Sequence, residues 1–462
     1  MASLSALSTL PAPITHASRV IASLDECLML GFGRLGAPQL KSLEALASTF
    51  VGTPLGAPVQ QASSAIRRSE LTEKPFVALA AARAALQGAQ HDALAAQLAS
   101  ACGFAPLTEP SLEGVAQETP SHHQVWLEST RQWLTELAIA GFLQLGPEAL
   151  MPFHATLEKI QEEPALARQG ALITGFWNEL VAAVPIPQGT HAPSYRWGDL
   201  WARTMLLSVR APDRAVVTEA SGEFRPLGAE LFEHAHVATL VVYGVLRDGT
   251  SSRWARATVS SYKVDVVQGP EIGALLSAKA STLLEALAGS LSIKLNKMPL
   301  SSTGDLLWDD KRASSAAAFA PLDEAQQAFG DKASSPAAVS APLAAERHPV
   351  LLARPVFLDA ASVAQKGDNL VVEQAGASIS VASARLGTVS VDRDRLSAAK
   401  QVFGLLRFDS GSWSIQPLVL AAGKGAHVSG AEWAKRALAT KGQGPTLTIL
   451  RERAGRLLRA KS

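Results

Sequence analysis

The spacing of apolar residues changes once along this 462-residue chain, close to residue 210. From about Ile14 to Val209 these residues recur at the spacing of amphipathic helices, interrupted by turns rich in Pro and Gly. After Arg210 the chain is β-branched and aromatic, and Asp248-Gly249 marks the turn of a hairpin. The sequence therefore predicts an α+β protein with an all-helical N-terminal domain, followed by two small β-rich units with flanking helices.

This change and the local composition divide the chain into four segments. We expect residues 1–209 to form the helical domain and residues 210–310 to form a domain of a β hairpin and a helix. Residues 311–349 are rich in Ala, Ser and Pro, so we interpret them as a linker with one possible short helix at Leu322 to Phe329. Residues 350–462 are expected to form a β-rich domain that ends in basic helices.

Composition narrows the class of protein. The hydrophobic fraction of 47% can fill real cores, and a net charge of +1 provides no overall field to attract nucleic acid or anionic lipid. The two cysteines, Cys27 and Cys102, support neither a disulfide framework nor a zinc site built on cysteine. The N-terminus lacks the pattern of a signal peptide, and no apolar run reaches the length of a membrane helix. These features predict a cytoplasmic protein.

The most conspicuous motif is a literal GxGxxG from Gly31 to Gly36. In dinucleotide-binding proteins such glycines follow a strand and let backbone amides approach a pyrophosphate, and an acidic residue about 20 residues later holds the ribose. Here an apparent helix precedes the motif, and Phe50 to Pro58 offers neither a strand nor a carboxylate. We interpret the motif as a turn between two helices.

Histidines and carboxylates offer only weak metal signals. His234 and His236 would share one face of a strand, but Glu233 would point to the opposite face and no spacing marks a third ligand. The sequence does not place His122, His123 and His154 in space. We therefore expect no metal site and no cofactor.

Catalytic motifs are missing as well. The chain has no GxSxG nucleophile elbow, no GxxxxGK[ST] phosphate loop and no cysteine in a catalytic context. The acidic pairs Asp309-Asp310 and Asp392 with Asp394 could hold a divalent cation or perform acid/base work, but solvated turn carboxylates are the commoner explanation. No catalytic residue is identified.

The segment from Tyr195 to Arg203 carries two tryptophans and two ion-pairing residues. Tryptophan and arginine often anchor protein interfaces, so the segment is a candidate docking face for a protein partner. The alternative, that the tryptophans fill a core, is favoured because they bring so much apolar area. The candidate residues are Arg196, Trp197, Asp199, Trp201 and Arg203.

The C-terminal end of the chain is locally basic, with nine Lys or Arg residues from Lys424 onward against Glu432 and Glu452. Such an excess could contact the phosphates of nucleic acid, and the hairpins could form OB-like barrels with Tyr262, Trp254 or Trp413 as stacking platforms. The candidate contacts are Arg451, Arg453, Arg456 and Arg459. A cationic last helix is equally typical of favourable placement at a helix dipole.

Three phrases, GFGRLGAPQLKSLEALASTFVGTPLGAPV, RWGDLWARTMLL and GLLRFDSGSWSIQPLVL, together resemble an uncharacterised bacterial family. Its members tend to be encoded beside a SWIM zinc-finger protein and beside MoxR-type AAA ATPase and von Willebrand A-domain proteins. The resemblance implies a protein partner in an ATP-driven assembly, such as the zinc-finger protein or the ATPase, and supplies no catalytic residues.

The sequence thus favours a non-enzymatic accessory or adaptor protein that binds other proteins, with no membrane partner. One alternative is a nucleic-acid-binding accessory protein that uses the β-rich second half. A second alternative is an enzyme whose site is too dispersed to recognise.

Overall fold

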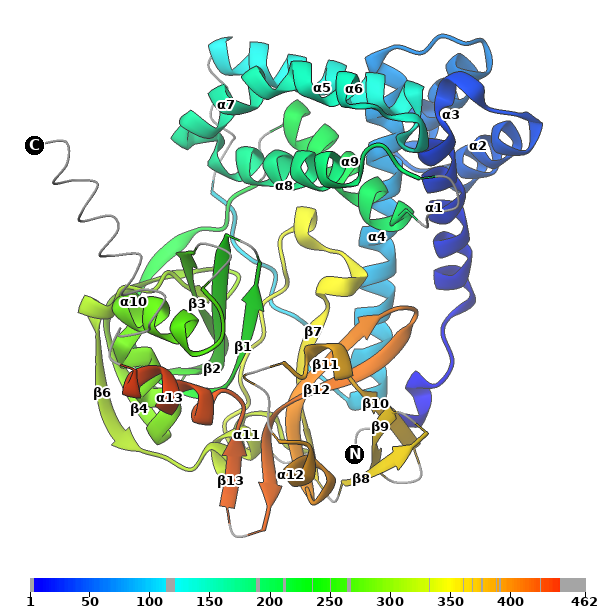
Figure 1. Cartoon of the computed structure of the whole chain (residues 1–462). Helices are drawn as coiled ribbons and strands as arrows, with labels where there is room; N and C mark the ends of the chain where they lie inside the picture. Colours follow the sequence, from blue (N-terminus) through cyan, green and yellow to red (C-terminus); the bar gives the residue numbers. More distant parts are fainter. Residues whose placement is uncertain are drawn as a thin grey trace, which may run out of the picture.

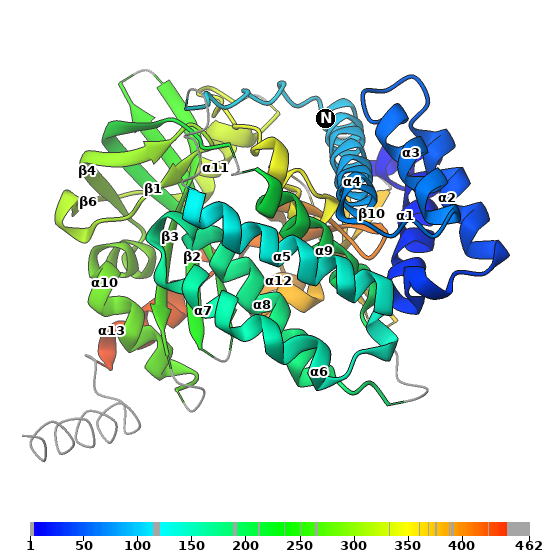
Figure 2. The ribbon, with the colours of Figure 1, turned by 90° about the horizontal axis from the view of Figure 1, so that it is seen from above.

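The computed structural model describes residues 4–113, 121–187, 192–210, 213–234, 236–249, 251–263, 267–331, 333–359, 361–367, 369–374, 377–387, 389, 392–423 and 425–440. Within them the chain forms a helical N-terminal part and two β sheets in the C-terminal half (Figure 1), which confirms the predicted α+β class. Seen from above, the helices between residues 121 and 209 overlie the sheets, and those between residues 12 and 67 stand to one side (Figure 2).

The helical part ends at residue 209, where the apolar spacing of the sequence changes. Its helices are α1 (Ala12–Leu30), α2 (Ala37–Thr49), α3 (Gly56–Arg67), α4 (Glu73–Cys102), α5 (Ser121–Ala140), α6 (Pro147–Leu150), α7 (His154–Glu162), α8 (Ala167–Ala183) and α9 (Ser194–Val209). Short 3-10 turns join or precede them: η1 (Leu4–Leu7), η2 (Phe32–Arg34), η3 (Phe142–Gln144), η4 (Met151–Phe153) and η5 (Pro164–Leu166).

Two of these turns repeat one another in sequence and in structure. GFGRLG at 31–36 links α1 through η2 to α2, and GFLQLG at 141–146 links α5 through η3 to α6. The contacts are reciprocal, because α1 packs on η3 and α5 packs on η2. The helices therefore form two related halves, α1 to α4 and α5 to α9, that meet at these turns. As predicted, the GxGxxG motif is a turn between two helices.

The longest helix, α4, belongs to two hydrophobic cores. Its first half, with Phe76 and Leu79, is buried among the other helices. Its second half, with Leu94 and Leu98, is buried against the second sheet, to which η1 also contributes. Figure 1 shows α4 running out of the helical part alongside that sheet. One helix of 30 residues thus ties two parts of the molecule together.

The first sheet closes into a five-stranded barrel. Its strands are β1 (Val217–Glu233), β2 (Val237–Asp248), β3 (Ser251–Tyr262), β4 (Leu291–Ser301), β5 (Asp305–Leu306) and the added edge strand β6 (Ala313–Ala318). The pairing runs β1-β2-β3-β5-β4 and returns to β1, with β3 and β5 parallel. Helix α10 (Pro270–Gly289) connects β3 to β4 and fills the core.

The second sheet repeats this topology with its first strand split in two. Its elements are β7 (Ala353–Leu358), β8 (Ser362–Lys366), β9 (Asn369–Gln374), β10 (Ala377–Val381), α12 (Arg393–Ser397), β11 (Gln401–Asp409), β12 (Ser412–Ala422) and β13 (Gly425–Val428). The order is β7-β11-β12-β10-β9-β8, and β10 and β12 are parallel. β7 and β8 are consecutive in the chain and lie at the two ends of this order. Together they occupy the position that the single long strand β1 occupies in the first barrel, where it pairs with both β2 and β4. Both barrels have the strand order of an OB fold, a five-stranded Greek-key barrel.

The two barrels pack against one another through their outer faces. Trp254 of the first barrel stacks on Tyr243 and contacts Phe403 of the second barrel, and Phe329 of α11 (Pro321–Phe329) contacts both Trp254 and Phe403. A buried ion-pair network joins the same faces: Glu230 of β1 accepts hydrogen bonds from the second barrel.

The segment from 311 to 349, which we expected to be a linker, contains β6, α11 and the turn η7 (Ala344–Glu346). Further short turns, η6 (Asp310–Arg312), η8 (Pro349–Leu351) and η9 (Ser383–Arg385), flank other strands. Glu324 of α11 is buried and accepts hydrogen bonds from Arg225 at 2.6 Å and Arg247 at 2.8 Å. Buried alanines and paired charges of α11 thus hold this segment against the first barrel, although its composition alone is typical of linkers.

The last described helix, α13 (Ala431–Ala439), follows the second barrel but packs on α10 of the first. Trp433, Ala434 and Ala437 are buried in the core of the first barrel. Helix α10 is, among the described residues, the one helix long and apolar enough to cross a membrane, from Glu271 to Gly289, but half of it is buried. The fold is therefore compatible with a soluble protein, whereas the cytoplasm stays a prediction.

Candidate functional site

The predicted docking segment lies on α9 at the centre of the helical part. The ring of Trp197 is 2% exposed and that of Trp201 is 0% exposed, and both belong to the helical core. Trp201 Nε1 donates to the Leu134 carbonyl at 3.0 Å, so its polar edge is satisfied inside the protein. The structure therefore places these two rings where a surface partner does not reach them.

The charged residues of the same segment take part in a buried network. Arg83 of α4 is fully buried and donates to both oxygens of Asp25 on α1, from Nε at 2.7 Å and Nη2 at 2.9 Å. Its Nη1 reaches Asp199 at 3.3 Å, and Asp199 also pairs with Arg203 at 3.0 Å. Burial raises the pKa of the Asp25 carboxyl to about 6, although Arg83 opposes the shift. The network joins α1, α4 and α9, one of the roles that buried ion pairs serve.

His348, from the segment expected to be a linker, closes this network. Its Nε2 lies 3.5 Å from Asp199 Oδ1 and 2.9 Å from Gln87 Nε2, and its Nδ1 accepts from the Val350 amide at 3.1 Å. Burial lowers the pKa of His348 to about 4, so the ring is neutral at pH 7. Of the predicted docking face, Arg196 alone is exposed, and it pairs with Glu179.

A larger candidate site lies where the two barrels meet. We call it the junction groove. It is a hollow of about 730 Å³ between the end of α10, the β10–β11 connection, β13 and the start of α13. Its charged or titratable lining residues are Asp392, Arg393, Arg395, His427, Glu432, Lys435 and Arg436.

Positive charge dominates the junction groove. Asp392 accepts from the Asp394 amide as the N-cap of α12, and Glu432 is paired with Lys435 at 2.9 Å. In contrast, Arg393 and Arg436 are exposed and have no carboxylate at ion-pair distance within the described part of the chain. Two guanidinium groups are therefore available to an anion.

His427 sets the hydrogen-bonding character of the groove wall. Its Nε2 is 3.1 Å from the Ala422 carbonyl, which only accepts, so Nε2 carries the proton. Its Nδ1 is 3.1 Å from Arg395 Nη1, which only donates, so Nδ1 is unprotonated. His427 therefore positions the Arg395 side chain in the groove wall and adds no carboxylate that would neutralise the arginine.

The remaining sequence candidates occupy structural positions. Asp309 accepts from the Lys311 amide, and Asp310 accepts from Ser281 and from Trp308. His234 and His236 are exposed beside Glu233. The two aspartates stabilise turns and a contact between η6 and α10. Among the described residues, these candidates belong to no shared group of possible metal ligands.

The proposed stacking residues differ in exposure. Tyr262 is 85% exposed on the outer face of the first barrel, whereas Trp413 is 6% exposed in the second core. Trp254 is half-buried in the contact between the barrels. Arg451, Arg453, Arg456 and Arg459 lie outside the described residues.

Sequence reasoning did not single out Arg393 and Arg395, and it counted Lys435 and Arg436 only as part of the basic end. These two pairs are about 40 positions apart, and only the packing of α13 onto the first barrel brings them together. A local signal existed in the alternating VDRDRL stretch, but it indicated a solvated turn equally well.

No protein-family model matches this chain, and searches of curated proteins and of solved structures find no significant match. The family resemblance, and the zinc-finger or ATPase partner that it implies, therefore stay predictions.

Proposed function

We propose that this chain is an accessory protein that binds single-stranded nucleic acid along the junction groove. This is the alternative that the sequence left to the β-rich half. The observation that carries it is the pair of exposed arginines, Arg393 and Arg436, that face a groove of about 730 Å³ without a carboxylate partner among the described residues. A guanidinium suits phosphate, because two of its N–H groups can bind two phosphate oxygens together.

Two further features support a polyanion rather than a single small anion. The 23 residues that follow α13 contain six Lys or Arg and one Glu, so the basic sequence continues directly from the rim of the groove. The barrels on either side have the topology of OB folds, which in other proteins bind oligonucleotides and oligosaccharides. The topology is an analogy, and the charges of the groove supply the argument for nucleic acid.

The contact between the two barrels restricts where single-stranded nucleic acid could bind. In OB folds the usual ligand face lies over strands 2 and 3. In the first barrel the apolar half of this face, with Tyr243 and Trp254, is covered by α11 and the second barrel. The usual face is therefore half occupied, which favours the groove as the binding region.

The test measures binding of a fluorescent oligo(dT) of about 20 nucleotides by anisotropy, with the full-length protein. Replacing both arginines, Arg393→Glu and Arg436→Glu, should weaken binding at least about tenfold, since it turns two attractive contacts into repulsive ones. The slope of log Kd against log salt concentration should also fall by about 1.4, because each of the two lost phosphate contacts contributes about 0.7 to that slope for single-stranded nucleic acid.

The matched control is Arg34→Glu with Lys41→Glu. Both are exposed, both lie in the helical part, and neither has a carboxylate at ion-pair distance among the described residues. This variant changes the net charge by the same amount. Equal loss in the groove variant and the control, or no loss in either, would refute the proposal. Equally tight binding of a duplex would refute its single-strand specificity.

A further inference from the structure

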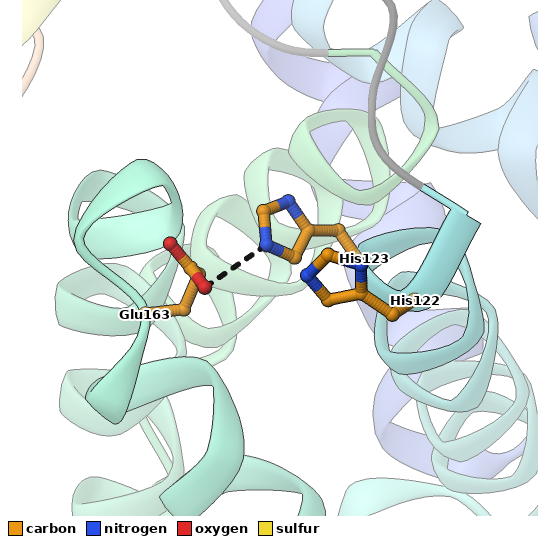
Figure 3. A group of neighbouring side chains, drawn as sticks. All are labelled: His122, His123 and Glu163. Atoms are coloured by element: carbon orange, nitrogen blue, oxygen red, sulfur yellow. Dashed lines mark ion pairs between the residues drawn. The ribbon is translucent and has the colours of Figure 1, made fainter.

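Three side chains that the sequence could not place together converge at one end of α5. His122 and His123 lie in its first turn, and Glu163 lies at the start of η5, between α7 and α8 (Figure 3). One ligand atom from each residue lies within 4.8 Å of the others. Among the residues that the structure describes, this is the one group of three His, Cys, Asp or Glu side chains gathered in this way.

The buried member of the group lacks a satisfied partner. His123 is 4% exposed, and its Nε2 has no hydrogen bond of good geometry in the described structure, although Glu163 Oε2 is 3.1 Å away. A buried ring nitrogen without a partner is uncommon, because no hydrogen bond offsets the free energy that its removal from water costs. The nitrogen and the carboxylate oxygen thus lie 3.1 Å apart without an aligned hydrogen bond, and a ligand bound by both would satisfy the buried ring.

Glu163 is held in position from its other oxygen. Its Oε1 accepts from the Ala165 amide at 3.1 Å, which leaves Oε2 directed at His123. This backbone hydrogen bond, followed by the contact with His123, lowers the pKa of Glu163, so the carboxylate is ionised at neutral pH. Second contacts of this kind orient the ligands of metal sites.

We propose that His122, His123 and Glu163 bind one Zn²⁺ ion, with the fourth coordination position open to solvent beside the exposed His122. Two imidazoles and one carboxylate are a donor set that zinc accepts in four-coordinate sites with an open position. Ideal tetrahedral bonds of about 2.1 Å place the ligand atoms about 3.4 Å apart. The His123 and Glu163 atoms are already 3.1 Å apart, and no pair among the three ligand atoms is separated by more than 4.8 Å.

Such an ion would clip the start of α5 to the α7–α8 connection, which lies 40 positions later in the chain. The site shares no residue with the buried Arg83 network or with the junction groove. Its occupancy is therefore independent of the proposed nucleic-acid binding.

The test uses the full-length protein, stripped with a chelator and titrated with ZnCl₂ by calorimetry at pH 7. The expected result is one tight site per chain. Co²⁺ in place of zinc should give the intense visible absorption typical of a tetrahedral site, which reports on geometry separately from affinity. His123→Ala and Glu163→Gln should each weaken the site by about 10- to 100-fold or more.

The control is His154→Ala. His154 is also exposed on a helix, has a glutamate at 3.6 Å and lies against a tryptophan ring, but the described part of the chain brings it no third ligand. It should leave the zinc titration unchanged. Circular dichroism of Glu163→Gln, which keeps the Ala165 contact, verifies that the helices persist. Weak, multiple binding that is unaffected by His123→Ala, or equal loss in His154→Ala, would overturn the proposal.

Discussion

At the scale of single residues, backbone contact between two glycines holds the halves of the helical part together. Gly31 has a φ of 96° and Gly141 a φ of 87°, both in the region that favours glycine. A Cβ on Gly31 would lie 2.5 Å from the Ala140 carbonyl oxygen, and a Cβ on Gly141 would lie 2.5 Å from the Leu30 carbonyl oxygen. Each turn therefore requires glycine both for its conformation and for the approach of the other turn.

We expect Gly31→Ala to lower the free energy of unfolding by at least about 3 kcal/mol, because it combines backbone strain with displacement of packed backbone. Urea denaturation followed by circular dichroism measures the loss. Gly36→Ala in the same motif is the control. Gly36 has a φ of −89°, and its nearest neighbour is the flexible Gln39 side chain, so we expect a change within about 1 kcal/mol. Equal effects of the two substitutions would contradict this account.

The same residues show how far sequence reasoning reaches. The missing strand and carboxylate were enough to predict a turn at Gly31, and this prediction is confirmed. The second copy of the motif at Gly141 was visible in the sequence, but its contact with Gly31 depends on how the helices pack. Likewise, His122 and His123 were noted, whereas Glu163 becomes their neighbour only through the packing of α5 on α7.

At the scale of elements, α4 is the mechanical link between the helical part and the second barrel. Its 30 residues span about 45 Å, which exceeds the depth of one small core. Leu79 and Leu98 are both fully or nearly fully buried, but in different cores. A substitution that destabilises one core should therefore also destabilise the other, because both cores contain part of the same continuous helix.

Leu98→Ala should lower the free energy of unfolding by about 2–5 kcal/mol, since it leaves a cavity against the second barrel. Hydrogen exchange should also speed up in the first half of α4, around Phe76 to Leu86, although no contact is removed there. Leu143→Ala, at a residue that is 36% exposed, should change stability by no more than about 0.5 kcal/mol. Faster exchange confined to the second barrel would show that α4 does not couple the cores.

Element types were easier to predict than element partners. The helices to residue 209 and the hairpin turn at Asp248-Gly249 follow from periodicity and turn chemistry, and both are present. Strand β6 escaped prediction because its residues are Ala and Ser, and β5 has only two residues. Such strands are held by pairing with β4, which local sequence does not encode.

At the scale of the whole molecule, the two barrels have the same topology, but neither barrel corresponds to one uninterrupted segment of the sequence. The first barrel takes α13 from beyond the second, and α11 of the former linker segment fills the space between them. Dividing the chain by composition separates pieces that fold against each other. The junction groove exists because of this exchange, since α13 brings Lys435 and Arg436 to the residues around α12.

Glu230 is the centre of the contact between the barrels. It is 4% exposed and accepts hydrogen bonds from Arg385 at 2.6 Å, from Arg407 at 2.9 Å and from the Tyr243 hydroxyl at 3.1 Å. Arg407 is itself 5% exposed and donates from Nε to Gln416 at 2.6 Å. Removing the carboxylate therefore leaves a buried guanidinium without its countercharge.

We expect Glu230→Ala to lower the free energy of unfolding by about 3–5 kcal/mol, measured by urea denaturation. Glu219→Ala, which removes an exposed carboxylate of the same strand, should cost no more than about 1 kcal/mol. The double variant Glu230→Leu with Arg407→Met replaces the most buried pair by apolar groups and should be more stable than Glu230→Ala, because the buried charge of Arg407 is removed together with its partner. If the double variant is the less stable of the two, the loss in Glu230→Ala comes from the packing of the interface and not from the stranded charge of Arg407.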